Sequence, residues 1–564
     1  MGKKIVIVGG VAGGATAAAR LRRLDESAEI VVLERTGFVS YANCGLPYYV
    51  GGVIKEKSAL TLQSPESFRI RFNIDVRVLS EVTAIDRENK TVTVKNLADG
   101  SEYTESYDKL ILSPGAKAMV PDTPGVDSRR VLKLRTVEDA LEMRRMVEEE
   151  KPERAVVVGG GFIGLEAAEN LMEAGVQVTL LQRSEQVLPP LDWDMACELH
   201  DHMRKKGLDL RFKHSVESYE EIPGGVRVHV VGKESIDCSF VVLAVGVVPE
   251  SELAKAAGLA LGPKGSIDVD SHMRTSDPDI YAVGDAVPVL DPLTGKLKLT
   301  PLAGPANKQG RIAADNICGI DSEYKGTIGS TVIKVFDLTA ACTGLNEKAA
   351  KAAGIAYERI VGYWGNHAGY YPGAENMLVK VLFAPDTGRI LGAQIVGPAG
   401  VDKRIDVFAT AIRAGLTGAD LAELELSYAP PYGSAKDPVN MCGFMIENIR
   451  AGIVKQFHWD QVAALPRDGS VTLLDVRNPG EYARGHIDGA VNIALDGIRE
   501  HLDELDKSKP VYVNCFSGMR SYIACRILSG NGFDCYNLSG GWRFYDLTQR
   551  GKADNEHYPC GERK

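Results

Sequence analysis

Two of the ten cysteines stand where a sulfur atom could become reactive. Cys44 lies in the segment SYANCGLPYY, just after a predicted strand–turn–helix–strand unit. Cys515 follows the apolar strand PVYVN and precedes the helix SYIACRIL, with Arg520 closing the loop between them. The N–H groups of such a turn and of the helix N-terminus favour a thiolate or persulfide anion. A thiolate at either position could take part in disulfide exchange.

The remaining cysteines are scattered, and none forms a CxxC or another close pair. This spacing predicts neither a metal site nor a disulfide framework. Cys525 and Cys535 fall on an apolar helix and an apolar strand, so we expect both in the core.

A glycine-rich turn follows the first predicted strand, KIVIV. Gly9 and Gly14 are the outer glycines of a GxGxxG-type pattern in which Val11 replaces the middle one. Such a turn lets the backbone approach a pyrophosphate at a helix N-terminus. Glu34 ends the next strand, 20 residues after Gly14, and can accept hydrogen bonds from ribose hydroxyls. The unit predicts a dinucleotide site.

The same plan returns about 150 residues later, in RAVVVGGGFIGLEAAENLMEAGVQVTLLQ. Gly159, Gly161 and Gly164 complete the pattern, and Glu166 follows. Gln182-Arg183 stands where Glu34 closed the first unit. An acid there would bind the ribose of NAD, whereas an Arg can meet a 2′-phosphate. Arg183 is equally consistent with a solvated surface residue, so NADH and NADPH both remain open.

Thr16, Arg20 and Arg23 lie at i, i+4 and i+7 of the first predicted helix and share one face. Two guanidinium groups suit phosphate oxygens, although a solvated basic face has the same spacing. Because this helix begins at the first nucleotide turn, its face can lie near Cys44.

The elements that position these residues need several domains, and 564 residues correspond to roughly four. An apolar fraction of 45% and a charged fraction of 25% exclude a disordered or fibrous chain. The net charge of −10 disfavours nucleic-acid binding through the overall field. No apolar run reaches the ~18 residues of a membrane span. We expect a cytoplasmic protein.

The segment TSDPDIYAVGD, which ends at Asp285, resembles the second flavin motif of the FAD-dependent pyridine-nucleotide disulfide oxidoreductases. The resemblance covers roughly residues 1–450 and implies that the first nucleotide is FAD, with Asp285 on its ribityl chain, and that the second is NADH or NADPH. We expect cofactor contacts at Gly9, Val11, Ala12, Gly14, Glu34, Arg35, Val82, Ser113, Gly115, Gly284, Asp285, Leu302 and Ala303 for FAD, and at Gly159, Gly161, Gly164, Glu166 and Arg183 for the nicotinamide nucleotide.

The C-terminal part resembles a rhodanese domain over about residues 455–564. The matching segments are DVR, EY, GHI and GA between Asp475 and Ala490, followed by the loop from Cys515 to Arg520. Four residues separate that cysteine and arginine, which is the sulfurtransferase count; the related phosphatase loops have one more. The resemblance implies that Cys515 carries a persulfide.

These observations predict an α/β fold with two Rossmann-like nucleotide-binding domains, an α+β dimerisation domain and a C-terminal α/β rhodanese domain. The expected bounds are 1–115 and 250–325 for the FAD-binding domain, 116–249 for the NAD(P)-binding domain, 326–450 for the dimerisation domain and 455–564 for the rhodanese domain.

Within the oxidoreductase family, Cys44 has Tyr49 where other branches carry a second cysteine. The NADH peroxidases and oxidases of the single-cysteine branch have a His where this chain has Ala12. The segment SxxNCGxPYY instead resembles the coenzyme A-disulfide reductases, in which Cys44 would rest as a mixed disulfide with CoA. That resemblance implies CoA contacts at Thr16, Arg20, Arg23, Ser40, Asn43, Arg71, Asn307 and Lys436.

The same resemblance points to Tyr370 and Tyr428 as residues that reach the active site from the partner chain of a homodimer. A tyrosine hydroxyl near Cys44 could donate to the thiolate. Both tyrosines are also consistent with ordinary interface residues.

The implied reaction passes hydride from NAD(P)H to FAD, after which the electrons break the Cys44 mixed disulfide and the thiolate attacks the next CoA-linked sulfur. Cys515 would deliver sulfane sulfur, so the substrate would be CoA persulfide, CoA disulfide or polysulfide. The alternatives are a CoA-disulfide reductase with an independent sulfurtransferase domain, an NAD(P)H oxidase or peroxidase, and a non-enzymatic sulfur sensor, which an intact Cys515 disfavours.

Overall fold

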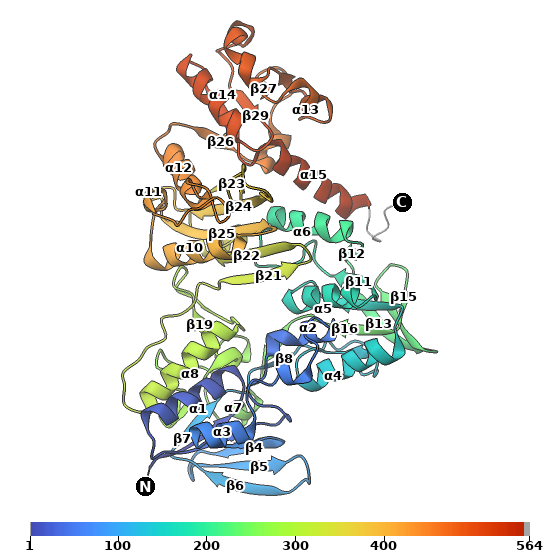
Figure 1. The fold of residues 1–564 in the computed structure, drawn as a ribbon, viewed down its shortest axis with the longest axis vertical. Helices are drawn as coiled ribbons and strands as arrows, with labels where there is room; N and C mark the ends of the chain where they lie inside the picture. The colour runs from blue at the N-terminus through green and yellow to red at the C-terminus, as the bar shows by residue number, and fades with distance from the viewer. Residues whose placement is uncertain (1, 558–564) are drawn as a thin grey trace. The chain divides into compact units, whose positions relative to one another are not determined.

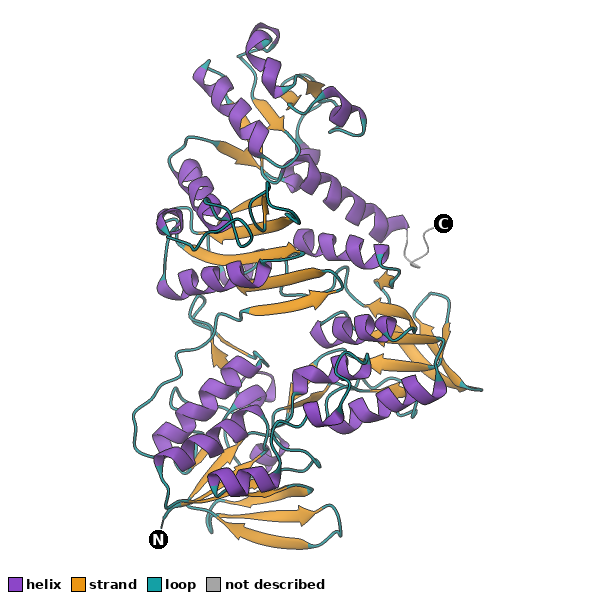
Figure 2. Cartoon of the chain, in the orientation of Figure 1, coloured by secondary structure: helices purple, strands orange, loops and turns teal. Residues whose placement is uncertain are grey.

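The computed structural model describes residues 2–557, which form two compact units. The first takes in the chain up to Arg183 together with Lys213–Thr327, and the second takes in Ser184–Phe212 together with the residues from Ile328 onward. Both units contain helices and strands (Figures 1 and 2). Within residues 2–557, every helix is too short or too polar to serve as a membrane span.

A parallel five-stranded sheet underlies the first glycine-rich turn, in the order β18-β7-β1-β2-β3. Its strands are apolar on both faces, as a parallel sheet covered by helices requires. Two helices, α1 and α8, pack against each other beside it. The bounds are β1 Lys4–Val8, β2 Glu29–Leu33, β3 Asp75–Arg77, β7 Lys109–Leu112, β18 Ile280–Ala282, α1 Ala12–Leu24 and α8 Ala303–Ile317.

The second glycine-rich turn lies in a parallel sheet in which β11, β10, β16 and β9 follow one another. The short helix α2 packs against α4 and α5. The segment after Cys44 therefore lies against the helices next to the second glycine-rich turn, within the first unit. The bounds are β9 Val131–Leu132, β10 Arg154–Val158, β11 Gln177–Gln182, β16 Phe240–Leu243, α2 Leu46–Val50, α4 Val137–Arg145 and α5 Phe162–Glu173.

Smaller elements complete the first unit. They include two antiparallel three-stranded sheets, β4-β5-β6 and β13-β14-β15, and the antiparallel pair β17-β8. The bounds are β4 Ser80–Asp86, β5 Thr91–Asn96, β6 Glu102–Ser106, β8 Ala116–Ala118, β13 Val216–Ile222, β14 Gly225–Val230, β15 Ile236–Cys238, β17 Val247–Pro249, α3 Pro65–Phe72 and α7 Glu252–Ala256.

The second unit contains an antiparallel five-stranded sheet in the order β21-β22-β25-β24-β23. Both α6 and α10 pack on its strands β22 and β25. The bounds are β21 Thr331–Val335, β22 Leu338–Gly344, β23 Glu358–Gly365, β24 Asn376–Phe383, β25 Ile390–Gly397, α6 Trp193–Lys205, α9 Glu347–Ala353, α10 Val401–Ala414, α11 Gly418–Glu423 and α12 Pro438–Arg450.

The last domain of this unit is a parallel sheet in the order β26-β30-β29-β27-β28, flanked by helices. Its bounds are β26 Lys455–Phe457, β27 Thr472–Asp475, β28 Val491–Asn492, β29 Val511–Asn514, β30 Cys535–Leu538, α13 Pro479–Ala483, α14 Met519–Gly530 and α15 Gly541–His557. The predicted fold class is therefore confirmed.

A buried charge cluster joins this last domain to the antiparallel sheet. The ammonium of Lys380 is fully buried and lies 3.0 Å from Asp192, 2.8 Å from Asp194 and 2.5 Å from Glu347. The indole Nε1 of Trp459, in the last domain, donates to Asp194 at 3.0 Å. Arg359 also pairs with Glu347 at 2.5 Å, so Lys380 and Arg359 together supply the positive charge that a bound cation would otherwise bring.

Candidate active sites

The two glycine-rich turns are built alike. Gly9 and Gly159 have φ of 93° and 109°, in the left-handed region that favours glycine. A Cβ on Gly14 or Gly164 would lie 1.9 Å from the carbonyl oxygen of Gly9 or Gly159, respectively. The internal repeat predicted from the sequence is thus the same strand–turn–helix geometry used twice.

The side chain at the end of the strand after each glycine-rich turn also has an equivalent partner. Glu34 accepts a hydrogen bond from the Gly10 N–H at 2.9 Å, and Gln182 accepts from the Gly160 N–H at 2.9 Å. Gln182 is therefore the structural counterpart of Glu34, while Arg183 is exposed. A neutral amide here removes the carboxylate that would repel a 2′-phosphate.

The residues around both turns fit dinucleotides. No side chain in the described residues caps α1 at Val11 or α5 at Gly161, which leaves first-turn N–H groups for an anion. In the first site the Gln309 side chain accepts from the Gly284 N–H at 2.8 Å, and its buried Nε2 has no partner in the described part of the chain. That donor is suited to a ligand oxygen beside Asp285.

The other predicted FAD contacts lie around the first turn or at the surface. Ser113 follows β7, and its Oγ would be 3.0 Å from a Cβ on Gly13, in the first turn of α1. Arg35 is exposed and forms an ion pair with Glu250 at 2.6 Å. The rest are partly buried or exposed: Ala12, Val82, Gly115, Leu302 and Ala303.

Cys44 lies in a single helical turn, Asn43–Gly45, that leads directly into α2. The residue is exposed, and it is a free thiol. Desolvation raises the pKa of Cys44, the nearby Glu166 raises it further, and Arg135 opposes both. The net effect of burial and these neighbouring charges is a thiol pKa above its ordinary value.

Arg135 is a site residue that the sequence did not single out. Its Nε donates to the Ala116 carbonyl at 2.9 Å, and its Nη2 lies 3.2 Å from Asp285. With the Asn43 side-chain amide turned so that its nitrogen donates to the Arg135 carbonyl, Arg135 Nη1 donates to the amide oxygen at 2.6 Å. One guanidinium thus ties the Cys44 turn to the flavin motif. In the sequence it is an ordinary arginine before a helix cap, with no motif to mark it.

Five of the seven predicted CoA contacts of the first unit lie on α1, α3 and α8. Thr16 donates to the Asn307 side chain at 2.6 Å. Arg20 pairs with the buried Asp315 at 2.8 Å, so a neighbouring carboxylate already balances its charge. Arg23 and Arg71 are exposed, and Ser40 is partly buried.

Besides Cys515 and Arg520, three predicted site residues belong to the second unit. Lys436 is exposed. The hydroxyls of Tyr370 and Tyr428 are 2.7 Å apart, and 75% and 46% of their surfaces are exposed. These two tyrosines therefore form an open polar–aromatic pair.

Cys515 lies at the end of β29, at the centre of its loop. Its sulfur accepts from the Gly518 N–H at 3.1 Å and from the Ser521 hydroxyl at 3.2 Å. Gly518 has φ of 101°, which turns its N–H toward the sulfur. The side chain is 1% exposed. These contacts are those that stabilise an anionic sulfur.

Arg520 points to Glu481 with two hydrogen bonds of 2.7 Å each. This contact lowers the pKa of Glu481 to about 2. The two parts of the rhodanese signature are thereby joined. Cys525 and Cys535 are 2% and 5% exposed and lie in the same apolar core, as predicted.

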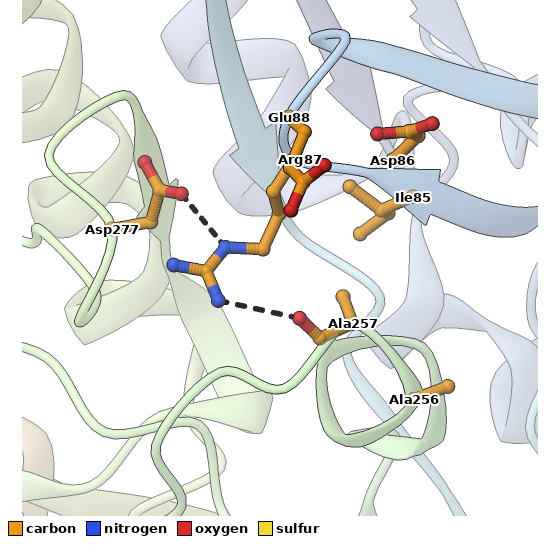
Figure 3. Close-up of a pocket in the computed structure, with 7 residues that line it drawn as sticks. All are labelled: Ile85, Asp86, Arg87, Glu88, Ala256, Ala257 and Asp277. Atoms are coloured by element: carbon orange, nitrogen blue, oxygen red, sulfur yellow. Dashed lines mark hydrogen bonds and ion pairs between the residues drawn. The ribbon is translucent and has the colours of Figure 1, made fainter.

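A separate hollow in the first unit carries no comparable chemistry (Figure 3). The Arg87 Nε donates to Asp277 at 2.8 Å, so its charge is already balanced. The lining residues Ile85, Asp86, Arg87, Glu88, Ala256, Ala257 and Asp277 include no cysteine, serine or histidine.

Three known domain families match successive parts of the chain. The pyridine nucleotide-disulphide oxidoreductase model matches residues 3–310, the dimerisation domain of that family matches residues 330–437, and the rhodanese-like domain matches residues 458–546. The coenzyme A disulfide reductase of Staphylococcus haemolyticus is 36% identical over 451 residues, which are 79% of this chain and 100% of that protein.

Two solved structures are similar over nearly the whole chain. The reduced CoADR-RHD of Bacillus anthracis is 49% identical with a TM-score of 0.95, covering 98% of this chain and 99% of that one. An NAD-dependent persulfide reductase from A. fulgidus is 39% identical with a TM-score of 0.90, covering 96% of this chain and 100% of that one.

Proposed function

The chain belongs to the pyridine nucleotide-disulphide oxidoreductases, and from that premise we propose that it is an NAD(P)H-dependent flavoprotein reductase of CoA persulfide or CoA disulfide. The observation that carries the proposal is Cys44, a single exposed thiol in the turn before α2, with the buried Tyr49 at the position of a second cysteine. One sulfur without an internal partner can exchange with an external thiol through a mixed disulfide.

FAD and a nicotinamide nucleotide are the cofactors, held at the turns of Gly9 and Gly159, and the bound flavin supplies the path for electrons between hydride donor and sulfur. The protein's own part is to hold Cys44 between Arg135 and Glu166. Asp285 and Gln309 offer an acceptor and a donor beside the first turn.

The CoA moiety is held by the exposed arginines of α1 and α3, Arg23 and Arg71, with Arg20, Thr16 and Asn307 alongside. Guanidinium groups match phosphate oxygens in charge and shape. Lys436 is a further CoA contact, and Tyr370 and Tyr428 act in the same reaction from the partner subunit of a homodimer; the match to the family's dimerisation domain supports a homodimer.

The rhodanese domain supplies sulfane sulfur. Cys515 carries a persulfide, which the Gly518 N–H and the Ser521 hydroxyl stabilise, and passes its outer sulfur to a thiol such as CoA. Reduction of the resulting CoA persulfide at Cys44 releases CoA and sulfide. A second candidate, CoA-disulfide reduction with an independent sulfurtransferase, is favoured by the Staphylococcus relative, which corresponds to only 79% of this chain.

Mass spectrometry of the air-oxidised holoenzyme tests the proposal. We expect a CoA adduct on the Cys44 peptide that a thiol reductant releases. The Cys44→Ser holoenzyme should bind FAD and accept hydride but lose reduction of CoA persulfide and CoA disulfide. Turnover of either substrate at the wild-type rate in that variant would exclude the proposed nucleophile, and Cys318→Ser, at a partly buried cysteine of the same unit, serves as the control.

A further inference from the structure

Cys44 lies in the turn Asn43–Gly45, about one helical turn before Tyr48, which lies on the face of α2 that contacts Glu166. That face meets α5, on which Glu166 is partly buried. The Tyr48 hydroxyl donates to Glu166 Oε1 at 3.3 Å. The carboxylate therefore reaches the redox turn through one tyrosine.

We propose that Glu166 and Tyr48 are positioning residues that take up and return the proton of the Cys44 thiol. The sequence alone had placed Glu166 with the nicotinamide nucleotide, and the inference rests on the proposed role of Cys44. In the step, the thiol proton passes to the tyrosine oxygen while the tyrosine hydroxyl gives its own proton to the carboxylate. The products are a Cys44 thiolate and a neutral Glu166; one proton moves in net terms, and no electrons move.

The pKa values of the three groups depend on one another. Burial raises the pKa of Glu166 to about 7, with Glu169 raising it and the Tyr48 hydrogen bond lowering it. Glu166 raises the pKa of both Cys44 and Tyr48, and a charge on Cys44 also raises that of Tyr48. Each group thus responds to ionisation of the others, which is how coupled sites behave.

Other charged groups face the same place. Arg135 lowers the pKa of Cys44, and Asp285 raises it. Glu169, one turn along α5, raises the pKa of Tyr48 as well as that of Glu166. Because Arg135 and Asp285 are paired with each other, Glu166 is the nearby carboxylate without a cationic partner in the described residues.

The test is the pH profile of Cys44 alkylation by iodoacetamide in the reduced holoenzyme without nicotinamide nucleotide, followed on the Cys44 peptide by mass spectrometry. For the wild type, the logarithm of the rate should rise in two limbs joined by a shoulder near pH 7, where Glu166 ionises. Glu166→Gln should abolish the shoulder and make alkylation at pH 8 about threefold to tenfold faster, because a like charge is removed.

Tyr48→Phe should move the shoulder to higher pH, since the hydrogen bond that favours the carboxylate is lost. Glu173→Gln removes a carboxylate of the same charge from the exposed end of α5. As the control, its alkylation profile should match that of the wild type. A Glu166→Gln profile that matches the wild type would overturn the proposal, as would an unmoved shoulder in Tyr48→Phe. Flavin content and melting temperature show that each variant is folded. Alkylation of Cys44 needs no CoA substrate, so this result stands apart from the test of the reductase.

Discussion

Arg520 binds both carboxylate oxygens of Glu481 through two separate nitrogens, each at 2.7 Å. The pair connects the first turn of α14, beside Cys515, to α13, 39 residues earlier in the chain. The guanidinium is therefore held beside the sulfur loop by a contact that fixes its orientation.

This pair predicts an acid-sensitive contribution to the stability of the rhodanese domain. The pKa of Glu481 is depressed from its ordinary 4.5 to about 2, so the contribution is fully present above pH 4.5 and is lost as the pH falls toward 2. Since both partners are partly exposed, we expect less than about 1 kcal/mol. Thermal unfolding of the wild type and Glu481→Gln should differ at pH 6 and converge near pH 2. A difference that persists unchanged at pH 2 would contradict this origin.

Cys515→Ser tests the division of labour between the two sulfurs. The variant should lose sulfur transfer from thiosulfate to thiol acceptors, because no persulfide can form. Reduction of free CoA persulfide or CoA disulfide should remain close to the wild-type rate, because those substrates reach Cys44 directly. Cys525→Ser, at a core cysteine, is the control for structural effects. Loss of free CoA persulfide reduction in Cys515→Ser would make Cys515 part of the core reaction.

Arg23→Ala should raise KM for CoA substrates about tenfold or more while leaving KM for inorganic polysulfide nearly unchanged. A charged hydrogen bond is worth roughly 1.5–3 kcal/mol, and polysulfide has no phosphates to bind. Arg20→Ala should also raise this KM, and in addition it should lower the melting temperature, because it leaves the buried Asp315 without its nearest cation. Steady-state kinetics with both substrates measure the effect, and the exposed Arg129→Ala is the control. An equal loss on both substrates would assign these arginines a structural role.

Lys380→Met should destabilise the second unit by about 3–5 kcal/mol, because three carboxylates remain buried around an uncharged side chain. Lys351→Met removes an exposed ammonium 3.6 Å from the same Glu347 and should cost no more than about 1 kcal/mol. Urea unfolding of both variants provides the comparison. Equal losses would mean that burial of the cluster contributes nothing.

The local sequence pattern was sufficient to predict the features that depend on neighbouring residues along the chain. The apolar strands, the positive-φ positions Gly9 and Gly159 and the loop between Cys515 and Arg520 each lie within one strand–turn–helix unit, where spacing dictates geometry. The solitary Cys44 was likewise visible, because the absence of a cysteine at Tyr49 is a property of the sequence itself. The fold class followed from these units in series.

Only the tertiary structure decided which distant side chains meet. It pairs Arg20 with Asp315, sets Arg135 between Asn43 and Asp285, and brings Tyr48 to Glu166 across 118 residues. It also groups Ser184–Phe212 with the second unit, where Asp192 and Asp194 share the Lys380 ammonium. Such contacts leave no periodic trace in a single sequence, because they depend on how separate elements pack and on the charge that each packed surface leaves to be balanced.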